Sequence, residues 1–250
     1  MSTGSHAVAV RAYEPSDLDA VLELLGASLS WVPDDMFRRF FEWKHLENPF
    51  GRSPAWVAVT GSRVVGFRTF LRWEFEHPDG RVRRAVRAVD TATHPEHQGR
   101  GIFRDLTLHA IDTLARDGVD FVFNTPNANS RPGYFKMGWQ EVGRLTVTIR
   151  PRDLGSLRRM LRARVPAERW SLRTSAGASA VDVLSDTRVD ELLRTAPAPA
   201  GLRTRRTREH LVWRYGFEPL AYRALTLDDD PRNGVAVFRI RRRGVATEAA

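Results

Sequence analysis

Cysteine is absent from the 250-residue sequence, which excludes disulfides, thiolate metal sites and a cysteine nucleophile. The sequence also lacks a run of roughly 18 apolar residues, the length that a membrane-spanning helix needs, and no positively charged, apolar leader opens it. The seven histidines form no ligand set, because His94 and His97 stand three apart in a proline-containing loop. We therefore expect a cytoplasmic protein with neither a metal nor a membrane partner.

Lysine is also scarce, since all of the 39 basic residues except Lys44 and Lys136 are arginines, and the net charge is +9. The arginines gather in residues 81–87, 150–164, 203–208 and 239–243. Such clusters attract phosphates in general, those of a nucleotide cofactor as well as those of RNA or DNA. Base-stacking aromatic residues are not interleaved with them, so we do not expect a nucleic acid partner.

A glycine-rich turn follows a predicted strand and opens a predicted helix. The strand covers residues 82–93, the turn ends in Gln-Gly-Arg-Gly at residues 98–101, and Leu106, Ile111 and Leu114 follow at helical spacing. The first N–H groups of a helix are unpaired and the helix dipole adds positive charge, so a pyrophosphate fits there. A Cβ at Gly99 or Gly101 would hold the phosphate away from the backbone.

Two common phosphate loops are excluded at this turn. No Lys-Ser or Lys-Thr pair follows the glycines, as a Walker loop requires. The three-glycine spacing of the dinucleotide fingerprint is missing, and Pro95 favours an irregular strand exit over a tight turn. The simpler alternative is an ordinary strand, turn and helix with incidental glycines.

A second block, residues 124–139, follows the short apolar run 121–123, which is typical of a buried strand. It contains an asparagine at 127, a tyrosine seven residues later at 134, and a Gly-Trp pair at 138–139. The two blocks lie in this order, about 30 residues apart.

Together the two blocks resemble the GNAT N-acetyltransferase superfamily. The acyl-CoA loop of this family has Gln or Arg, then two residues, Gly, one residue, and Gly or Ala. In this sequence Gln98 and Gly101 match the first two fixed positions, and Phe103 stands at the third, where it departs from the pattern. Asn127 matches an asparagine that contacts the pantetheine arm, and Tyr134 matches a tyrosine near the thioester sulfur.

The resemblance implies an α+β fold with a central mixed sheet flanked by helices, and transfer of an acetyl group from acetyl-CoA to a primary amine. The residues that it assigns to acetyl-CoA binding are Thr91, Ala92, Thr93, Gln98, Gly99, Arg100, Gly101, Ile102, Phe103, Arg104 and Asn127. Tyr134 would protonate the departing thiolate, and Asp90 would accept the proton of the amine, with Glu47 and His45 behind it. The residues alone leave alternatives open: Asn127 as a turn residue, Tyr134 as a core aromatic and Asp90 as a structural residue at a strand end.

The order of the predicted elements agrees with one GNAT-like unit over residues 1–150. We expect a strand at 7–13, a helix whose capping box pairs Ser16 with Asp19, a helix at 34–46, a hairpin at 55–59 and 64–73, and a last strand at 140–149. Residues 151–200 are expected to be a helical linker, with helices at 154–161 and 181–193 and an Ala-Pro-rich stretch at 195–201.

Residues 201–250 repeat a pattern from the front of the chain. The triplet at 43–45, Trp-Lys-His with Pro49 after it, recurs as Trp-Arg-Tyr at 213–215 with Pro219 after it. Chance is one explanation; the other is a partial second GNAT-like unit, with a helix at 207–215 and a hairpin of strands 221–227 and 234–241. Because a lone hairpin is marginal in water, we expect it either to extend the first sheet or to form a homodimer.

The acceptor is the least determined part. In the GNAT fold the segment 28–51 walls the acceptor side, and here it carries Trp31, Phe37, Phe40, Phe41, Trp43 and Phe50. These residues favour a hydrophobic or ring-bearing amine, unless they are core residues. A different class of function is a non-catalytic module that binds acyl-CoA or another protein. Release of CoA in the presence of a panel of amines would distinguish the two classes.

Overall fold

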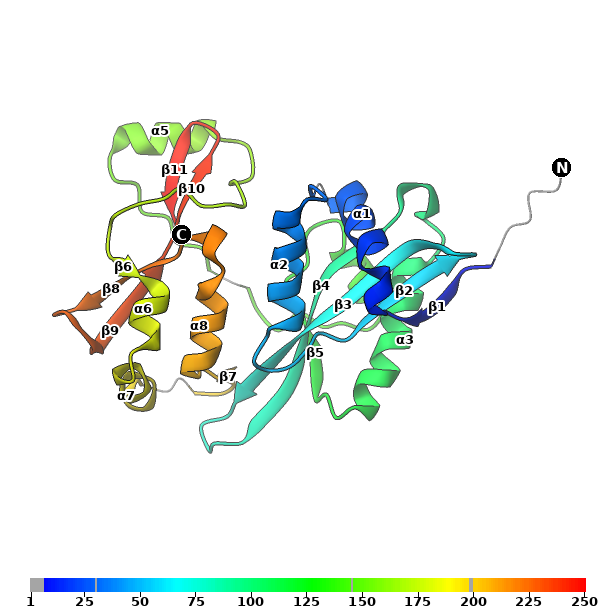
Figure 1. Ribbon diagram of the computed structural model, residues 1–250, viewed down its shortest axis with the longest axis horizontal. Helices are drawn as coiled ribbons and strands as arrows, with labels where there is room; N and C mark the ends of the chain where they lie inside the picture. The colour runs from blue at the N-terminus through cyan, green and yellow to red at the C-terminus, as the bar shows by residue number, and fades with distance from the viewer. Residues whose placement is uncertain (1–6, 30, 145, 198–199) are drawn as a thin grey trace. The chain divides into compact units, whose positions relative to one another are not determined.

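The computed structural model describes residues 7–29, 31–144, 146–197 and 200–250 (Figure 1). The chain folds into two compact units. The N-terminal unit runs to Glu141 and includes the segment that ends at Arg205; the C-terminal unit takes the residues from Val142 and those from Arg206 onward. The stretch that the sequence predicts as a linker therefore contributes secondary structure to the C-terminal unit. No described helix is long and apolar enough to cross a membrane.

The N-terminal unit is built on a mixed sheet with the strand order β1-β2-β3-β4-β5. Its strands are β1 (Ala9–Ala12), β2 (Ala55–Thr60), β3 (Arg63–Glu76), β4 (Val82–Thr93) and β5 (Phe121–Phe123). Neighbours in this order pair antiparallel except for β4 and β5, which pair in parallel. The short β7 (Arg203–Thr204) adds to β3 beside its end.

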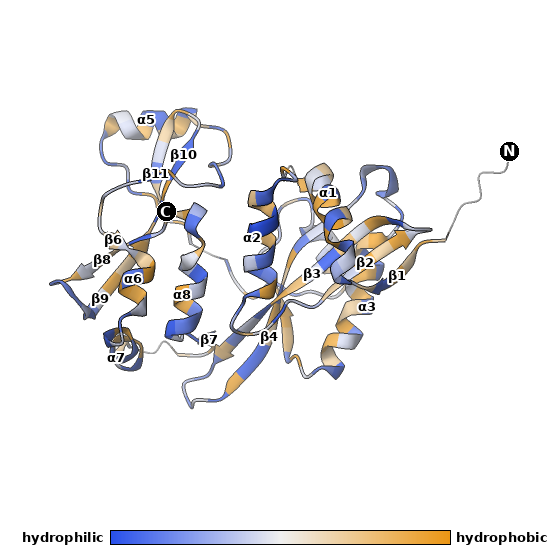
Figure 2. Ribbon diagram, in the orientation of Figure 1, coloured by the Kyte–Doolittle hydropathy of each residue, from blue (hydrophilic) through white to orange (hydrophobic). Residues whose placement is uncertain are grey.

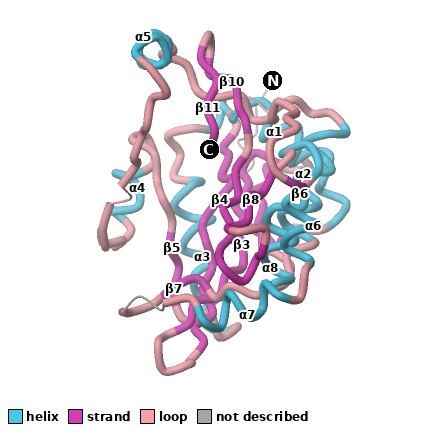
Figure 3. The backbone as a smooth tube through the Cα atoms, turned by 90° about the vertical axis from the view of Figure 1, so that its left-hand side faces the viewer, coloured by secondary structure: helices cyan, strands magenta, loops and turns pink. Residues whose placement is uncertain are grey.

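Helices cover both faces of this sheet (Figure 3). On one face lie α1 (Leu18–Leu29), which follows the short helix η1 (Pro15–Asp17), and α2 (Asp35–Leu46), whose Phe41 contacts Phe67 of β3. On the other face lie α3 (Ile102–Arg116), which follows the short helix η2 (Pro95–His97), and α4 (Arg131–Lys136). Leu106, Ala110 and Leu114 of α3 pack with Trp56 and Phe70 of the sheet in one hydrophobic cluster. Figure 2 shows apolar residues along these inner strands, whereas the tip of the β3–β4 hairpin is hydrophilic.

The C-terminal unit has a three-stranded antiparallel sheet of its own, in the order β6-β8-β9. The strands are β6 (Ala178–Ser179), β8 (Arg223–Leu227) and β9 (Asp230–Phe238). Its helices are α5 (Leu154–Arg162), α6 (Ala180–Ser185), α7 (Arg188–Thr195), α8 (Arg208–Gly216) and the short η3 (Glu218–Leu220). A separate hairpin joins β10 (Ile240–Arg243) to β11 (Ala246–Ala249).

The predicted hairpin in the tail is confirmed, with a tighter turn than expected. Strand β9 begins at Asp230 because Asp228 and Asp229 both have positive φ, 52° and 55°, and make a two-residue turn between the strands. One expectation was that this hairpin extends the first sheet, and that expectation is wrong. Strand β8 pairs instead with β6 within the C-terminal unit. Formation of a homodimer stays a prediction.

Three other expectations need correction. The described part of residues 140–149 contains no strand, because no neighbouring strand pairs with it. Val142, Val147 and Ile149 of this segment are exposed, and Leu145 lies outside the described residues. The cap before α1 is not Ser16 with Asp19, because the Asp17 carboxylate accepts the Glu14 N–H at 2.8 Å. The helix predicted at 181–193 is two helices, broken where Asp186 takes extended backbone angles. The Ala-Pro-rich stretch includes positions 198 and 199, which lie outside the described residues.

Candidate functional site

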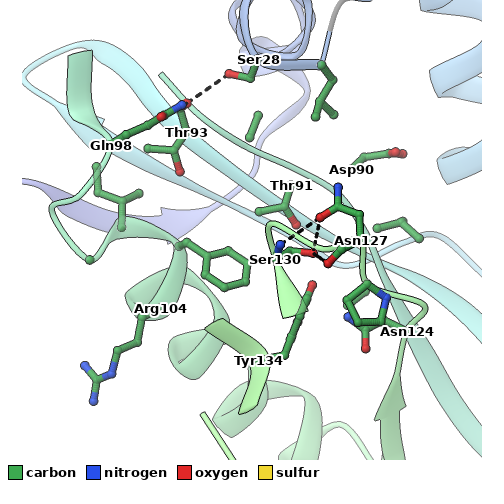
Figure 4. A pocket seen from close by; sticks show the side chains of 18 of the residues that line it. Ser28, Asp90, Thr91, Thr93, Gln98, Arg104, Asn124, Asn127, Ser130 and Tyr134 are labelled. Atoms are coloured by element: carbon green, nitrogen blue, oxygen red, sulfur yellow. Dashed lines mark hydrogen bonds between the residues drawn. The ribbon is translucent and has the colours of Figure 1, made fainter. Parts of the chain in front are cut away.

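A pocket of about 610 Å³ opens where β4 and β5 part (Figure 4). The two strands pair only along residues 85–87 of β4 and 121–123 of β5. Strand β4 continues to Thr93, whereas the chain after β5 turns into the loop 124–130. The second half of β4, that loop, the start of α3 and Tyr134 of α4 line the pocket between them.

The start of α3 is suited to an anion. Gly99 and Gly101 have φ values of 75° and 80°, a left-handed conformation that glycine adopts without strain. Gly101 is the N-cap residue, and no side chain caps the helix. The first N–H groups of α3 are therefore left for a ligand, and the helix dipole adds positive charge at this point.

The structure brings the sequence-predicted residues together. Those that line the pocket are Asp90, Thr91, Ala92, Thr93, Gln98, Gly99, Gly101, Ile102, Phe103, Arg104, Asn127 and Tyr134. Of the residues predicted to bind acetyl-CoA, Arg100 is the one that does not line it.

Phe103, the departure from the family pattern, is accommodated by α4. Its ring stands edge-on to the ring of Tyr134, with centroids 5.3 Å apart. A Cβ added at Gly133 would lie 3.0 Å from the Phe103 ring, so the glycine makes room for this side chain. The bulk that could crowd a diphosphate at the start of α3 is held against α4 instead.

Two of the amide side chains that line the pocket, those of Gln98 and Asn127, already make hydrogen bonds within the chain. Gln98 donates its Nε2–H to the Thr93 carbonyl oxygen at 3.3 Å. The Asn127 Oδ1 accepts the Ser130 N–H at 2.9 Å and the Ser130 hydroxyl at 3.0 Å, directly before α4. Asn127 therefore acts as a turn residue in this structure, which is one of the two interpretations of its sequence.

A β-bulge in β4 places the side chains of Asp90 and Thr91 on opposite faces of the sheet from those that regular alternation would give. Opposite Arg68 of β3, strand β4 carries two residues, Asp90 and Thr91, and Asp90 has a φ of 43°. Thr91 consequently faces Tyr134 and α3, whereas the Asp90 carboxylate is directed away from Tyr134 (Figure 4) and meets α2.

Asp90 is held by two side chains of α2. Its Oδ2 accepts hydrogen bonds from Lys44 Nζ at 2.6 Å and from His45 Nε2 at 2.9 Å, and His45 Nδ1 lies 3.0 Å from the Ser53 hydroxyl. Burial opposes ionisation of Asp90, but the charge of Lys44 and the bond from His45 hold its pKa well below the usual range. Burial lowers the pKa of His45, whose hydrogen bond to Asp90 opposes the shift only in part. Asp90 is thus an ionised carboxylate with low proton affinity beside a neutral histidine.

Tyr134 is almost fully buried, and its hydroxyl accepts a hydrogen bond from Arg68 Nη1 at 2.8 Å. Its ring packs between Phe103 and Trp139. Nothing in the sequence singles out Arg68, because an arginine within a strand is ordinarily a surface residue.

The remaining candidates lie outside the pocket. Glu47 is exposed at the end of α2. Trp31, Phe37, Phe40, Phe41 and Trp43 are buried, and their rings contact one another or Phe67, which favours the interpretation of these aromatics as core. From the segment 28–51, only Ser28 and Leu29 of the described residues line the pocket. Across the described chain, no three His, Asp or Glu side chains gather as a metal ion would require.

Comparison with known proteins shows one clear family match. Residues 9–142, just over half of the chain, match the family model described as an acetyltransferase (GNAT) domain. No curated protein matches the sequence at a significant level.

Several solved structures match over 57% of this chain. A predicted acetyltransferase with acetyl-CoA from Clostridium acetobutylicum is 16% identical, is covered over 96% of its length and has a TM-score of 0.48. Glucosamine-6-phosphate N-acetyltransferase from Arabidopsis thaliana is 16% identical, covered over 98%, with a TM-score of 0.45. A GCN5-related N-acetyltransferase from Ralstonia eutropha is 19% identical, covered over 99%, with a TM-score of 0.46.

Proposed function

Because the chain belongs to the GNAT acetyltransferase family, we propose that it is an N-acetyltransferase that moves an acetyl group from acetyl-CoA to a primary amine. The observation that carries this proposal is the meeting of two groups in one pocket. The uncapped start of α3 offers N–H groups to a diphosphate, and the Tyr134 hydroxyl offers a proton to a leaving thiolate. The two groups come from separate segments of the sequence.

The donor would lie along the opened edge of β4. Its diphosphate would bind at residues 99–104, and the N–H groups of residues 91–93 would hold the thioester carbonyl oxygen as negative charge develops on it. Because β5 does not pair with this part of β4, backbone groups on that edge are available to the pantetheine arm.

The acid and the base would act from different sides. Tyr134 would give its proton to the thiolate, so that CoA leaves as the thiol. An ammonium acceptor must first lose a proton, and Asp90 is the carboxylate that lines the pocket. Since Lys44 and His45 keep Asp90 ionised, it is a weak base; we propose that it orients the acceptor amine and passes the proton on to water.

The test is thiol release from acetyl-CoA with a panel of amines that ranges from small polar amines to aromatic ones. We expect release that depends on one class of amine and that falls in the Tyr134→Phe variant. Binding of acetyl-CoA without release for every amine would favour the non-catalytic module.

The C-terminal unit supports a second, structural proposal, that it is a partial GNAT-like unit. In it β6 precedes helices, then β8 and β9 follow, and the antiparallel order is β6-β8-β9. In the N-terminal unit β1 precedes α1 and α2, then β2 and β3 follow, in the antiparallel order β1-β2-β3. The same order of elements and pairings agrees with the repeated tryptophan and proline spacing in the sequence.

A further inference from the structure

Arg68 is a buried cation at the centre of the N-terminal unit. It lies on β3, opposite the bulge in β4, and none of its surface is exposed. Its guanidinium carbon stands 4.7 Å from the ring centre of Phe70 and 5.4 Å from those of Phe103 and Tyr134. A guanidinium stays protonated in proteins, so this site holds a positive charge among aromatic rings even though burial lowers the pKa of Arg68.

Only one of the three guanidinium nitrogens of Arg68 has hydrogen-bond partners in the described part of the chain. Nη1 donates to the Tyr134 hydroxyl oxygen at 2.8 Å and also to the Thr91 hydroxyl. Nε and Nη2 are buried and have no hydrogen-bond partner among the described residues. No carboxylate of the described chain forms an ion pair with Arg68, in contrast to Lys44, which pairs with Asp90 on the opposite face of the sheet.

Such an arrangement is costly for the fold. A buried charge without a counter-ion loses its hydration, and apolar residues of similar volume in place of buried ionic groups are often neutral or stabilising. Stability therefore gives little reason for an arginine at this position. The groups that Arg68 does bind are hydroxyls of two residues that line the pocket, Tyr134 and Thr91, and of these Tyr134 is the proposed proton donor.

We propose that Arg68 is a positioning residue that makes Tyr134 an effective proton donor, an inference that rests on the proposed acetyl transfer. Because Arg68 donates to the phenolic oxygen, the proton of that oxygen cannot point at Arg68 and is free to point into the pocket. When the carbon–sulfur bond of the acyl group breaks, sulfur keeps the electron pair and takes this proton. The tyrosinate left behind is stabilised by the adjacent guanidinium until the phenol is restored by the surplus proton that the attacking nitrogen loses, through water, as it becomes the amide.

The test compares Arg68→Met and Arg68→Lys with the parent chain, alone and together with Tyr134→Phe. Methionine keeps an unbranched side chain of similar reach without the charge, and lysine keeps the charge without the forked geometry. We expect Arg68→Met to melt at or above the parent temperature and to bind CoA within about threefold, while kcat falls by about tenfold to a hundredfold. Arg68→Lys should recover part of the loss.

The decisive comparison is the double variant. If Arg68 acts through Tyr134, Arg68→Met should not lower kcat further once Tyr134 is phenylalanine. An equal loss in both backgrounds, or no loss in either, would overturn the proposal.

A readout without turnover separates this proposal from the proposed function. The ultraviolet difference spectrum of the parent chain minus that of Tyr134→Phe, recorded at neutral pH, follows Tyr134 alone. A hydrogen bond that the phenolic oxygen accepts shifts this absorption band, so we expect the band to move when Arg68→Met is present in both chains, and an unmoved band would contradict the coupling of the two residues. A moved band in a chain that releases no CoA would instead uphold the coupling and refute acetyl transfer.

Discussion

Gly66→Ala should loosen the start of α3 from the sheet. Gly66 lies on β3 directly beneath this helix, and an added Cβ would stand 2.6 Å from Ile102 Cγ2, 3.0 Å from Ala58 Cβ and 3.1 Å from Leu106 Cδ1. Carbon atoms in contact normally keep about 3.5–4.0 Å. One methyl group therefore meets three neighbours at once.

The size of the effect follows from which neighbour can move. Ile102 is β-branched and stiff at χ1, so its methyl cannot swing aside alone. The first turn of α3 must shift with it, and overpacking of this kind costs about 1–3 kcal/mol. Ile102 follows Gly101, so the same shift displaces the N–H groups proposed to bind the diphosphate. We expect CoA affinity to fall by about tenfold, which corresponds to about 1.4 kcal/mol.

Urea unfolding measures the first effect and calorimetric titration with CoA the second. Gly143→Ala is the matched control, since an added Cβ there meets nothing within 4 Å and its φ is not positive, and it should change neither value. A Gly66→Ala chain with parental stability and CoA affinity would show that α3 is not seated on Gly66 as described, and the reasoning about the phosphate site would fail with it.

Three further predictions concern the pocket and the C-terminal unit. Gly101→Glu should abolish CoA binding in a folded chain, because it places a side chain and a negative charge at the start of α3; unaltered affinity by calorimetry would remove the phosphate site. Tyr134→Phe should lower kcat by about ten- to a thousandfold and leave CoA affinity near its parental value, whereas full activity would reduce Tyr134 to a packing role. Burial, then the charges of Arg214 and Arg206, lower the pKa of His210 to about 4. The fold therefore favours neutral His210. The stabilisation that this gives is fully present above about pH 6.5 and is lost as pH falls towards 4. Between pH 7.5 and pH 5 we expect the free energy of unfolding to fall by about 2 kcal/mol. Urea unfolding at the two pH values should show a smaller loss in His210→Phe, and an equal loss would place the acid sensitivity elsewhere.

Local signals in the sequence account for much of the fold. Strand β4 covers residues 82–93 as predicted, and α3 begins directly after Gly101, because a turn of glycines between an apolar strand and a helical pattern leaves few alternatives. The helix and hairpin of the tail follow from the same kind of signal. The segment 140–149 shows the limit: alternation indicates a strand, but a strand also needs a partner, and none pairs with the described part of this segment.

The site was predictable in its backbone and less so in its side chains. The residues around the start of α3 line the pocket because their positions follow from chain order. The sheet faces on which Asp90 and Thr91 lie could not be predicted from the sequence. Simple alternation along the strand would put Asp90 on the α3 face and Thr91 on the α2 face, and the bulge at Asp90 exchanges the two. Arg68 was missed since its burial depends on three rings from β3, α3 and α4, which only the folded chain brings together.

The most direct test of the central claim follows the acyl group itself. The full chain is incubated with acetyl-CoA that carries an isotope label in the acetyl group, together with the amine panel, and the products are identified by mass spectrometry. Acetyl transfer predicts an N-acetylated amine that carries the label in an amount equal to the free CoA formed, with the Gly101→Glu chain inactive. Label that stays on CoA with every amine, while acetyl-CoA is bound at saturation, would contradict it.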